Sequence, residues 1–164
     1  MRMLFVLIAM VLSTNLCLGQ TPDGAILGGK WTYRSFHNSP APVTDDPKTA
    51  AERALALIFA EAVITLETPS STVLKGAIDW PGGGLDLQGT FQLDSAGPTL
   101  SIIGTGRANT DTAGWEYDYR GQLAYHWPNG INQVPALVGT VIRAKPHNGA
   151  AAGYTASFVA VKRP

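Results

Sequence analysis

The chain has 164 residues, of which 45% are hydrophobic and 15% are charged, and its 12 basic side chains balance 12 acidic ones. With no stripe of basic residues to neutralise phosphates, we expect no nucleic-acid partner. Cys17 is the only cysteine, so the chain after it has no disulfide, no cysteine nucleophile and no cysteine metal ligand.

Residues 1–19 are predicted to be a signal peptide. Arg2 supplies a positive start, Met3 to Val11 is an apolar run, and a small residue, Gly19, precedes the expected cleavage point. Two alternatives stay open: the run persists as an uncleaved anchor, or Cys17 is lipidated. Cleavage predicts an exported protein, periplasmic or extracellular, with 11 basic against 12 acidic residues. No later segment is long and apolar enough to form a stable membrane-spanning helix.

Residues 20–164 are predicted to form a single all-β domain. The chain contains 18 glycines and 11 prolines, which place turn signals at intervals of about 8–15 residues. Such spacing is typical of antiparallel sandwiches and barrels. About 145 residues remain after cleavage, which is enough to bury one hydrophobic core.

One short helix is predicted near residues 47–55, after a proline-rich loop. Asp46 is a good N-cap, because its carboxylate accepts backbone N–H bonds, and Pro47 suits the first helical position. From Ala56 to Glu67 apolar side chains alternate along the chain, which favours a strand. The alternative is a helix that continues as far as Ala62.

About eight strands are predicted in all, and Leu85 to Leu93 shows the clearest alternation of apolar and polar side chains. The links are too short for parallel crossovers, so neighbouring strands should pair antiparallel and close into an up-and-down barrel. The predicted strands are Lys30–Phe36, Ala56–Glu67, Thr72–Trp80, Leu85–Leu93, Thr99–Arg107, Trp115–Tyr125, Ala136–Lys145 and Tyr154–Arg163.

The ends of this pattern resemble the calycin group, which contains lipocalins and avidins. The resemblance rests on Gly29-Lys30-Trp31 in the first strand, a cation, Arg163 or else Lys162, in the last, and the meander of strands. It implies that Trp31 closes one end of the barrel and packs under Arg163. The spaced avidin ligands and the usual lipocalin disulfides are absent, so biotin binding is not implied. The stretches 31–36 and 127–130 also resemble exported bacterial proteins, which implies no activity.

Aromatic side chains form the main candidate site. They are predicted to point into the barrel, where they would line a pocket for a flat or apolar ligand and where phenol hydroxyls would orient it. The alternative is that they fill the interior, because eight strands leave a space just wide enough for side chains. The candidate residues in the lumen are Tyr33, Trp80, Trp115, Tyr117 and Tyr119.

Histidines give a weaker candidate. His37 and His147 end predicted strands at one rim, where Asp45 or Asp46 would complete a three-ligand metal site, whereas His126 falls at the opposite rim. No local ligand spacing supports such a site, so we interpret these histidines as loop residues in water. We predict neither a metal nor a cofactor.

Carboxylates give the last candidates. Glu116 and Asp118 share one strand face, as acid–base pairs do, but Arg120 continues the same row, which favours a solvated outer row. Glu61 lies among apolar residues, and a buried carboxylate there would be a functional candidate.

The predicted function is a secreted, non-enzymatic β-barrel that binds a small apolar or aromatic ligand. The first alternative is a structural or interaction module with a filled barrel, which contacts another exported protein or a like subunit through the polar strand faces and the loop at residues 127–130. The second is an enzyme with its site at the rim, for which we find no convergent set of acid, base and nucleophile. The oligomeric state does not follow from the sequence.

Overall fold

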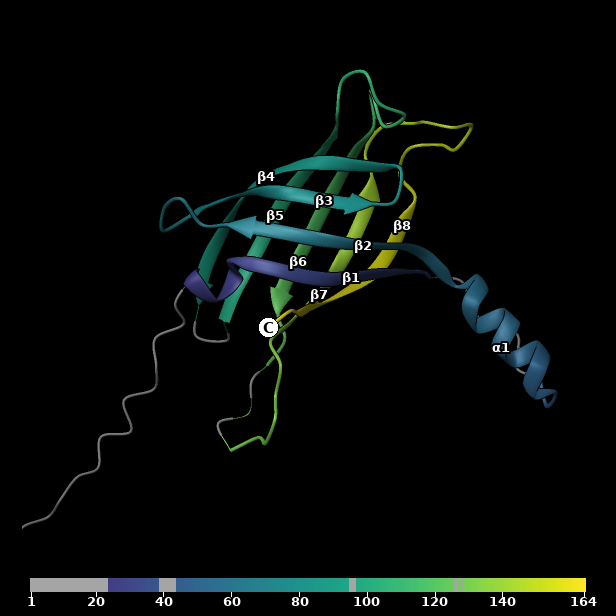
Figure 1. Ribbon diagram of the computed structural model, residues 1–164, viewed down its shortest axis with the longest axis horizontal. Coiled ribbons are helices and arrows are strands. Elements are labelled where there is room, and N and C mark those ends of the chain that lie inside the picture. The colour runs from purple at the N-terminus through teal and green to yellow at the C-terminus, as the bar shows by residue number, and fades with distance from the viewer. Residues whose placement is uncertain (1–23, 39–43, 95–96, 126, 128) are drawn as a thin grey trace, which may run out of the picture.

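The structure, a computed structural model, describes residues 24–38, 44–94, 97–125, 127 and 129–164. The predicted signal peptide and His126 lie outside the described residues. Eight antiparallel strands follow one another around a closed barrel, in which each strand pairs with the next and the last pairs with the first (Figure 1). This confirms the predicted up-and-down barrel with one short helix.

The elements follow the predicted order along the chain. A short 3-10 helix, η1 (Gly24–Leu27), precedes the barrel, and α1 (Pro47–Ala56) lies between the first two strands. The strands are β1 (Gly29–His37), β2 (Ile58–Glu67), β3 (Val73–Trp80), β4 (Gly83–Asp94), β5 (Gly97–Gly106), β6 (Glu116–Leu123), β7 (Ala136–Arg143) and β8 (Thr155–Lys162).

The helix α1 begins and ends for identifiable reasons. The Asp46 carboxylate accepts a hydrogen bond from the Thr49 backbone N–H at 2.8 Å, and Pro47 follows as the first helical residue. Hydrogen bonding from the side chain and then the backbone of Thr49 lowers the pKa of Asp46. The helix buries no side chain and stands away from the barrel (Figure 1). It ends at Ala56, and the alternative of a helix as far as Ala62 is wrong because β2 pairs with β1 from Ile58 onward.

Alternation along the strands divides the barrel into an inner and an outer face. Inward side chains from every strand form one continuous core, and Trp31 and Leu27 at the closed end are completely buried. The Trp31 indole N–H donates to the Leu27 carbonyl oxygen at 3.0 Å, so the polar atom of this buried ring is satisfied by η1. The end at which β1 begins is therefore filled.

The cation above Trp31 is Lys162, not the expected Arg163. The Lys162 Nζ lies 5.4 Å from the centroid of the Trp31 ring and donates to the Ile26 carbonyl oxygen at 2.6 Å. Register explains the difference, because Trp31 pairs directly with Lys162 across β1 and β8, so both side chains take the same face. Arg163 comes one residue later, and its Nε donates to the hydroxyl of Thr32, which is exposed.

Candidate ligand pocket at the open end of the barrel

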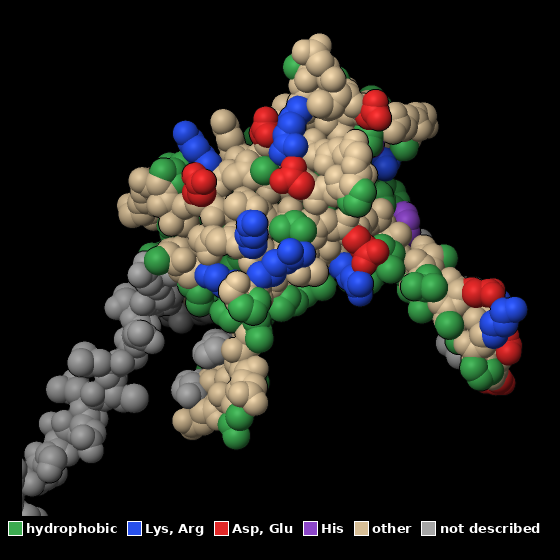
Figure 2. All heavy atoms as spheres, in the orientation of Figure 1, with side chains coloured by type: hydrophobic (Ala, Val, Ile, Leu, Met, Phe, Trp, Pro, Cys, Tyr) green, Lys and Arg blue, Asp and Glu red, His purple; other side chains and the backbone are tan. Residues whose placement is uncertain are grey.

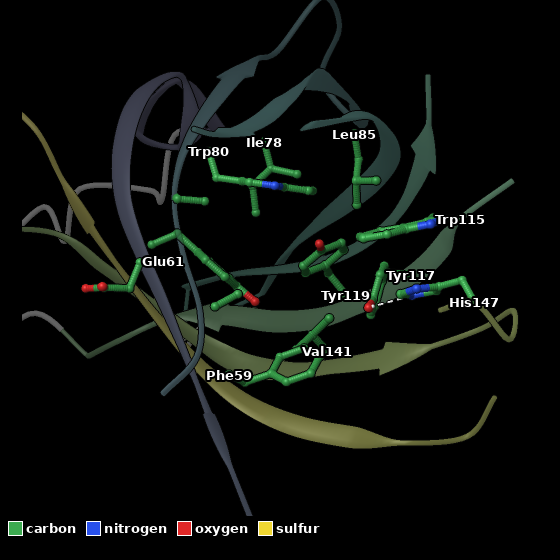
Figure 3. A pocket seen from close by; sticks show the side chains of 13 residues that line it. Phe59, Glu61, Ile78, Trp80, Leu85, Trp115, Tyr117, Tyr119, Val141 and His147 are labelled. Carbon is green, nitrogen blue, oxygen red and sulfur yellow. Dashed lines mark hydrogen bonds between the residues drawn. The ribbon is translucent and has the colours of Figure 1, made fainter. Parts of the chain in front are cut away.

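A cavity of about 370 Å³ opens at the other end of the barrel, where β1 ends and β2 begins (Figure 3). Small-molecule sites in proteins usually measure about 300–1,000 Å³ and are mostly apolar, so this volume suits a small ligand. The lining residues are Tyr33, Phe59, Ala60, Glu61, Ala62, Ile78, Trp80, Leu85, Trp115, Tyr117, Tyr119, Val141 and His147.

All five aromatic residues predicted to face the lumen line this cavity. Tyr33, Tyr117 and Tyr119 lie on inward positions of β1 and β6 and are buried. Trp80 is the last residue of β3, and Trp115 immediately precedes β6. The structure therefore brings together the residues that the sequence selected by alternation alone.

The floor of the cavity is a packed aromatic cluster. The ring of Tyr33 lies 6.2 Å from Tyr119 and 5.6 Å from Phe158, measured between centroids. Burial raises the pKa of both phenols well above the usual value of 10, so the hydroxyls stay neutral. Tyr119 lines the cavity, so its neutral hydroxyl is placed to donate a hydrogen bond to a polar atom of a ligand.

One wall of the cavity is a stack of three rings. Trp80 and Trp115 lie nearly parallel, with centroids 6.3 Å apart, and Trp115 stacks on His147 at 3.9 Å. The Nε2 atom of His147 lies 2.8 Å from the Tyr117 hydroxyl oxygen, within hydrogen-bond distance (Figure 3). Burial, and then the charge of Arg143, lower the pKa of His147, so this ring is neutral near pH 7.

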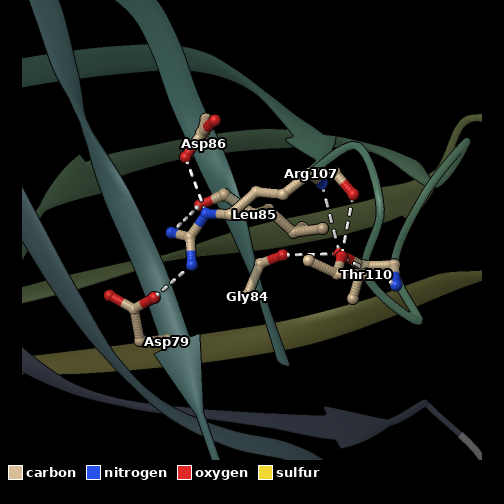
Figure 4. A network of polar contacts seen from close by, with 7 residues as sticks. Asp79, Gly84, Leu85, Asp86, Arg107 and Thr110 are labelled. Carbon is tan, nitrogen blue, oxygen red and sulfur yellow. Dashed lines mark hydrogen bonds and ion pairs between the residues drawn. The ribbon is translucent and has the colours of Figure 1, made fainter. Parts of the chain in front are cut away.

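The loop that carries Trp115 is fixed to the β3–β4 hairpin by a polar network (Figure 4). The Arg107 guanidinium donates to the carboxylates of Asp79 and Asp86, each at 2.8 Å, and these bonds raise the pKa of Arg107. The buried Thr112 hydroxyl donates to the Gly84 carbonyl oxygen at 2.9 Å. The network thereby holds Trp115 against Trp80.

Gly106 shows how closely this loop lies against the barrel. A Cβ atom at Gly106 would lie 1.6 Å from the Thr112 carbonyl oxygen, so no other residue fits there without moving the backbone. The predicted strand 99–107 thus ends at Gly106, and Arg107 turns out of the sheet to join the network.

Two lining residues, Phe59 and His147, were not predicted to face the cavity, because their positions depend on tertiary structure. Phe59 was placed on the face opposite Ala60, but a register shift between Ser35 and Phe36 on the partner strand lets both line the cavity. His147 lies in a loop and reaches the cavity by stacking on Trp115. No periodic pattern in the sequence signals either contact.

The two predicted rim histidines, His37 and His147, lie at the same end of the barrel, beside the mouth of the cavity. The centroids of the His37 and Phe59 rings are 5.3 Å apart, and His37 forms a short hydrogen bond with the Tyr154 hydroxyl. Phe59 in turn lies 6.4 Å from Tyr117, the partner of His147. Across the described part of the chain, no three histidines, cysteines or carboxylates lie close enough together to hold a metal ion.

The carboxylate candidates face outward. Glu61 is exposed, pairs with Arg34 at 2.6 Å and points away from the cavity, so it is not the buried carboxylate that would be a functional candidate (Figure 3). Glu116 pairs with Lys145 at 2.7 Å, and Arg120 hydrogen-bonds with the Ser101 hydroxyl. These side chains belong to the outer face of the barrel, opposite Tyr117 and Tyr119.

No protein-family model matches this chain, and no curated protein or solved structure matches it. Within the residues that the structure covers, no helix has the length and apolar character needed to cross a membrane. The eight-stranded closed barrel is established by the strand order and pairing described above.

Proposed function

We propose that this protein binds a small, flat, apolar or aromatic molecule in the open-end cavity and that it is not an enzyme. The observation that carries the proposal is the cavity of about 370 Å³, which is lined by stacked and edge-packed aromatic rings while the opposite end of the barrel is filled. A planar ligand would gain contact with the ring stack and with the edges of the floor residues.

The calycin resemblance, which rests on residues at the closed end of the barrel, supports the same proposal. Trp31 closes the barrel beneath a cation, as the resemblance implies, although that cation is Lys162. A barrel closed at one end and hollow at the other is suited to carrying or sequestering a small molecule. The fold alone does not fix such a function, so the lining of the cavity carries the argument.

Tryptophan fluorescence tests this proposal directly, because Trp80 and Trp115 line the cavity. We expect a saturable change when the mature protein is titrated with planar aromatic compounds. Ala62→Phe would fill the cavity and weaken binding at least tenfold, whereas Val63→Phe, on the outer face of the same strand, would leave it unchanged. No response to any compound by the folded parent protein, or equal affinities in both variants, would refute the proposal.

A second candidate function, contact with another protein chain, is favoured by the loop at residues 124–135. Tyr125, Trp127, Ile131 and Val134 are 64%, 67%, 87% and 56% exposed. This loop extends from the closed end of the barrel (Figure 1), and its described residues include no lysine, arginine, aspartate or glutamate, while hydrophobic side chains are visible on it in Figure 2. Exposed aromatic and aliphatic side chains in one place are typical of interaction surfaces.

Self-association is the simplest test of that second function. If the loop joins two copies of the chain, sedimentation velocity should show a concentration-dependent dimer. Ile131→Asp should abolish it, and Leu55→Asp, at an exposed position on α1, should not. A parent protein that stays monomeric at every concentration would exclude a like subunit as the partner.

A further inference from the structure

An arginine faces inward at the mouth of the cavity. Arg143 ends β7 and follows Leu137, Gly139 and Val141 on the inner face of that strand. Its guanidinium carbon lies 5.9 Å from the centroid of Phe59 and 5.5 Å from that of Tyr154. A cation is thus placed among the aromatic rings that surround the opening.

Two nitrogen atoms at this mouth are buried without a hydrogen-bond partner among the described residues. One is Nε of Arg143, whose Nη1 donates to the Ala151 carbonyl oxygen at 3.2 Å. The other is Nδ1 of His147, whose Nε2 is paired with the Tyr117 hydroxyl. Buried donors are rarely left unpaired in proteins. Arg143 Nε is always a donor, and His147 Nδ1 is a donor when Nε2 accepts from the Tyr117 hydroxyl; in that tautomer the pair points to an acceptor that the described chain does not supply.

No carboxylate of the described chain compensates the Arg143 charge. Arg143 forms no ion pair with any described residue. Two acids on the strands that line the cavity, Glu61 on β2 and Glu116 on β6, are on the outer face and are paired with Arg34 and Lys145. The mouth therefore carries a positive charge above a neutral aromatic cavity.

We propose that the ligand carries a carboxylate, which Arg143 and His147 hold at the mouth while its apolar body occupies the cavity. This inference rests on the proposed function and specifies the class of ligand. A guanidinium offers two parallel N–H donors that match the two oxygens of a carboxylate. The Nε edge of Arg143 is the edge that lacks a partner, and His147 can donate from Nδ1 when the Tyr117 hydroxyl donates to its Nε2.

The test compares two compounds of nearly the same shape, anionic 2-naphthoate and neutral 2-naphthamide, titrated calorimetrically against the mature protein at pH 7.5. We expect naphthoate to bind at least tenfold more tightly than the amide. Raising the salt concentration should weaken naphthoate binding and leave amide binding nearly constant, because charge attraction is screened.

Variants assign the preference to Arg143. Arg143→Met removes the charge and keeps the apolar stem, so it should bring the two affinities within about twofold of each other. Arg34→Met, which removes an outward arginine on the adjoining part of the barrel, should retain the tenfold preference. Circular dichroism checks that each variant is folded. The comparison of naphthoate with naphthamide in the parent protein does not depend on the variants, so it tests the carboxylate preference even if a variant fails to fold.

The outcomes separate this inference from the proposed function. Equal affinities of the parent protein for the acid and the amide would overturn the carboxylate proposal and leave the pocket intact. A preference that survives Arg143→Met would overturn the role of Arg143. Binding of neither compound, nor of any other planar aromatic compound, would overturn both.

Discussion

The two ends of the barrel are built from the same eight strands, yet one is filled and the other is hollow. Strand β2 shows the cause in four inward positions. Ile64 and Leu66 lie toward the closed end and are buried in the core, whereas Ala60 and Ala62 lie toward the open end and line the cavity. Side-chain size along one strand therefore decides where the barrel has room for a ligand.

The two ends also differ in how they satisfy polar groups. At the closed end, the Trp31 N–H and the Lys162 ammonium both donate to carbonyl oxygens of η1. At the open end, nitrogen atoms of Arg143 and His147 are buried and have no hydrogen-bond partner in the part of the chain that the structure describes. The polar groups named at the closed end are paired, whereas the unpaired nitrogen atoms at the open end are the ones on which the proposed ligand site rests.

Substitutions on β2 should show the largest difference between the two ends. Leu66→Ala, in the filled half, should lower the free energy of unfolding by about 2–5 kcal/mol, because it leaves a cavity in a close-packed core. Ala62→Leu, in the hollow half, should keep that free energy within about 1 kcal/mol of the parent value or raise it, because the new side chain fills existing space. Urea unfolding followed by circular dichroism measures both. Equal losses in the two variants would mean that the open half is packed as tightly as the closed half.

The cation at the closed end gives a smaller and sharper test. Lys162→Met should cost about 1–2 kcal/mol, because it removes the contact with the Trp31 ring and leaves the Ile26 carbonyl oxygen without its donor. Arg163→Met should cost less than about 0.5 kcal/mol, since its bond to Thr32 is exposed. The urea midpoints of the two variants show which residue stabilises the closed end. A larger loss of unfolding free energy in Arg163→Met than in Lys162→Met would favour Arg163 as the cation that packs on Trp31, as predicted from the sequence.

The sequence predicted the strands well because alternation and turn signals are local. The helix start at Asp46-Pro47, the closed meander and the inward faces of Tyr33, Tyr117 and Tyr119 all follow from patterns within a few residues. Each strand prediction differed from the structure by no more than a few residues at its ends.

The remaining features depend on pairing across the barrel. The choice of Lys162 over Arg163 needs the register of β1 with β8, and the position of Phe59 needs the register shift between β1 and β2. The unpartnered nitrogen of Arg143 and the stacking of His147 depend on loops whose path no periodicity reveals. For this reason the sequence identified the aromatic lining of the cavity but not the charge at its mouth.

The smallest expected effect is the titration of His147 at the cavity wall. Burial and the nearby Arg143 charge lower its pKa below the usual 6.5 in the folded protein. The unfolded chain therefore takes up this proton first as the pH falls, so the free energy of unfolding should decrease below about pH 6.5 and stop decreasing below the folded pKa.

His147→Gln should remove this part of the pH dependence, since glutamine does not titrate. Urea unfolding at pH 7.5 and pH 5.5 gives the difference, and NMR titration of the His147 ring in the parent protein gives its pKa directly. Bound naphthoate should raise that pKa, because an anion beside the ring favours its protonated form. A His147 pKa at or above 6.5 without ligand would mean that the ring is solvated rather than packed against Trp115. The two ends of the barrel would then not differ in how the polar atoms of His147 are satisfied.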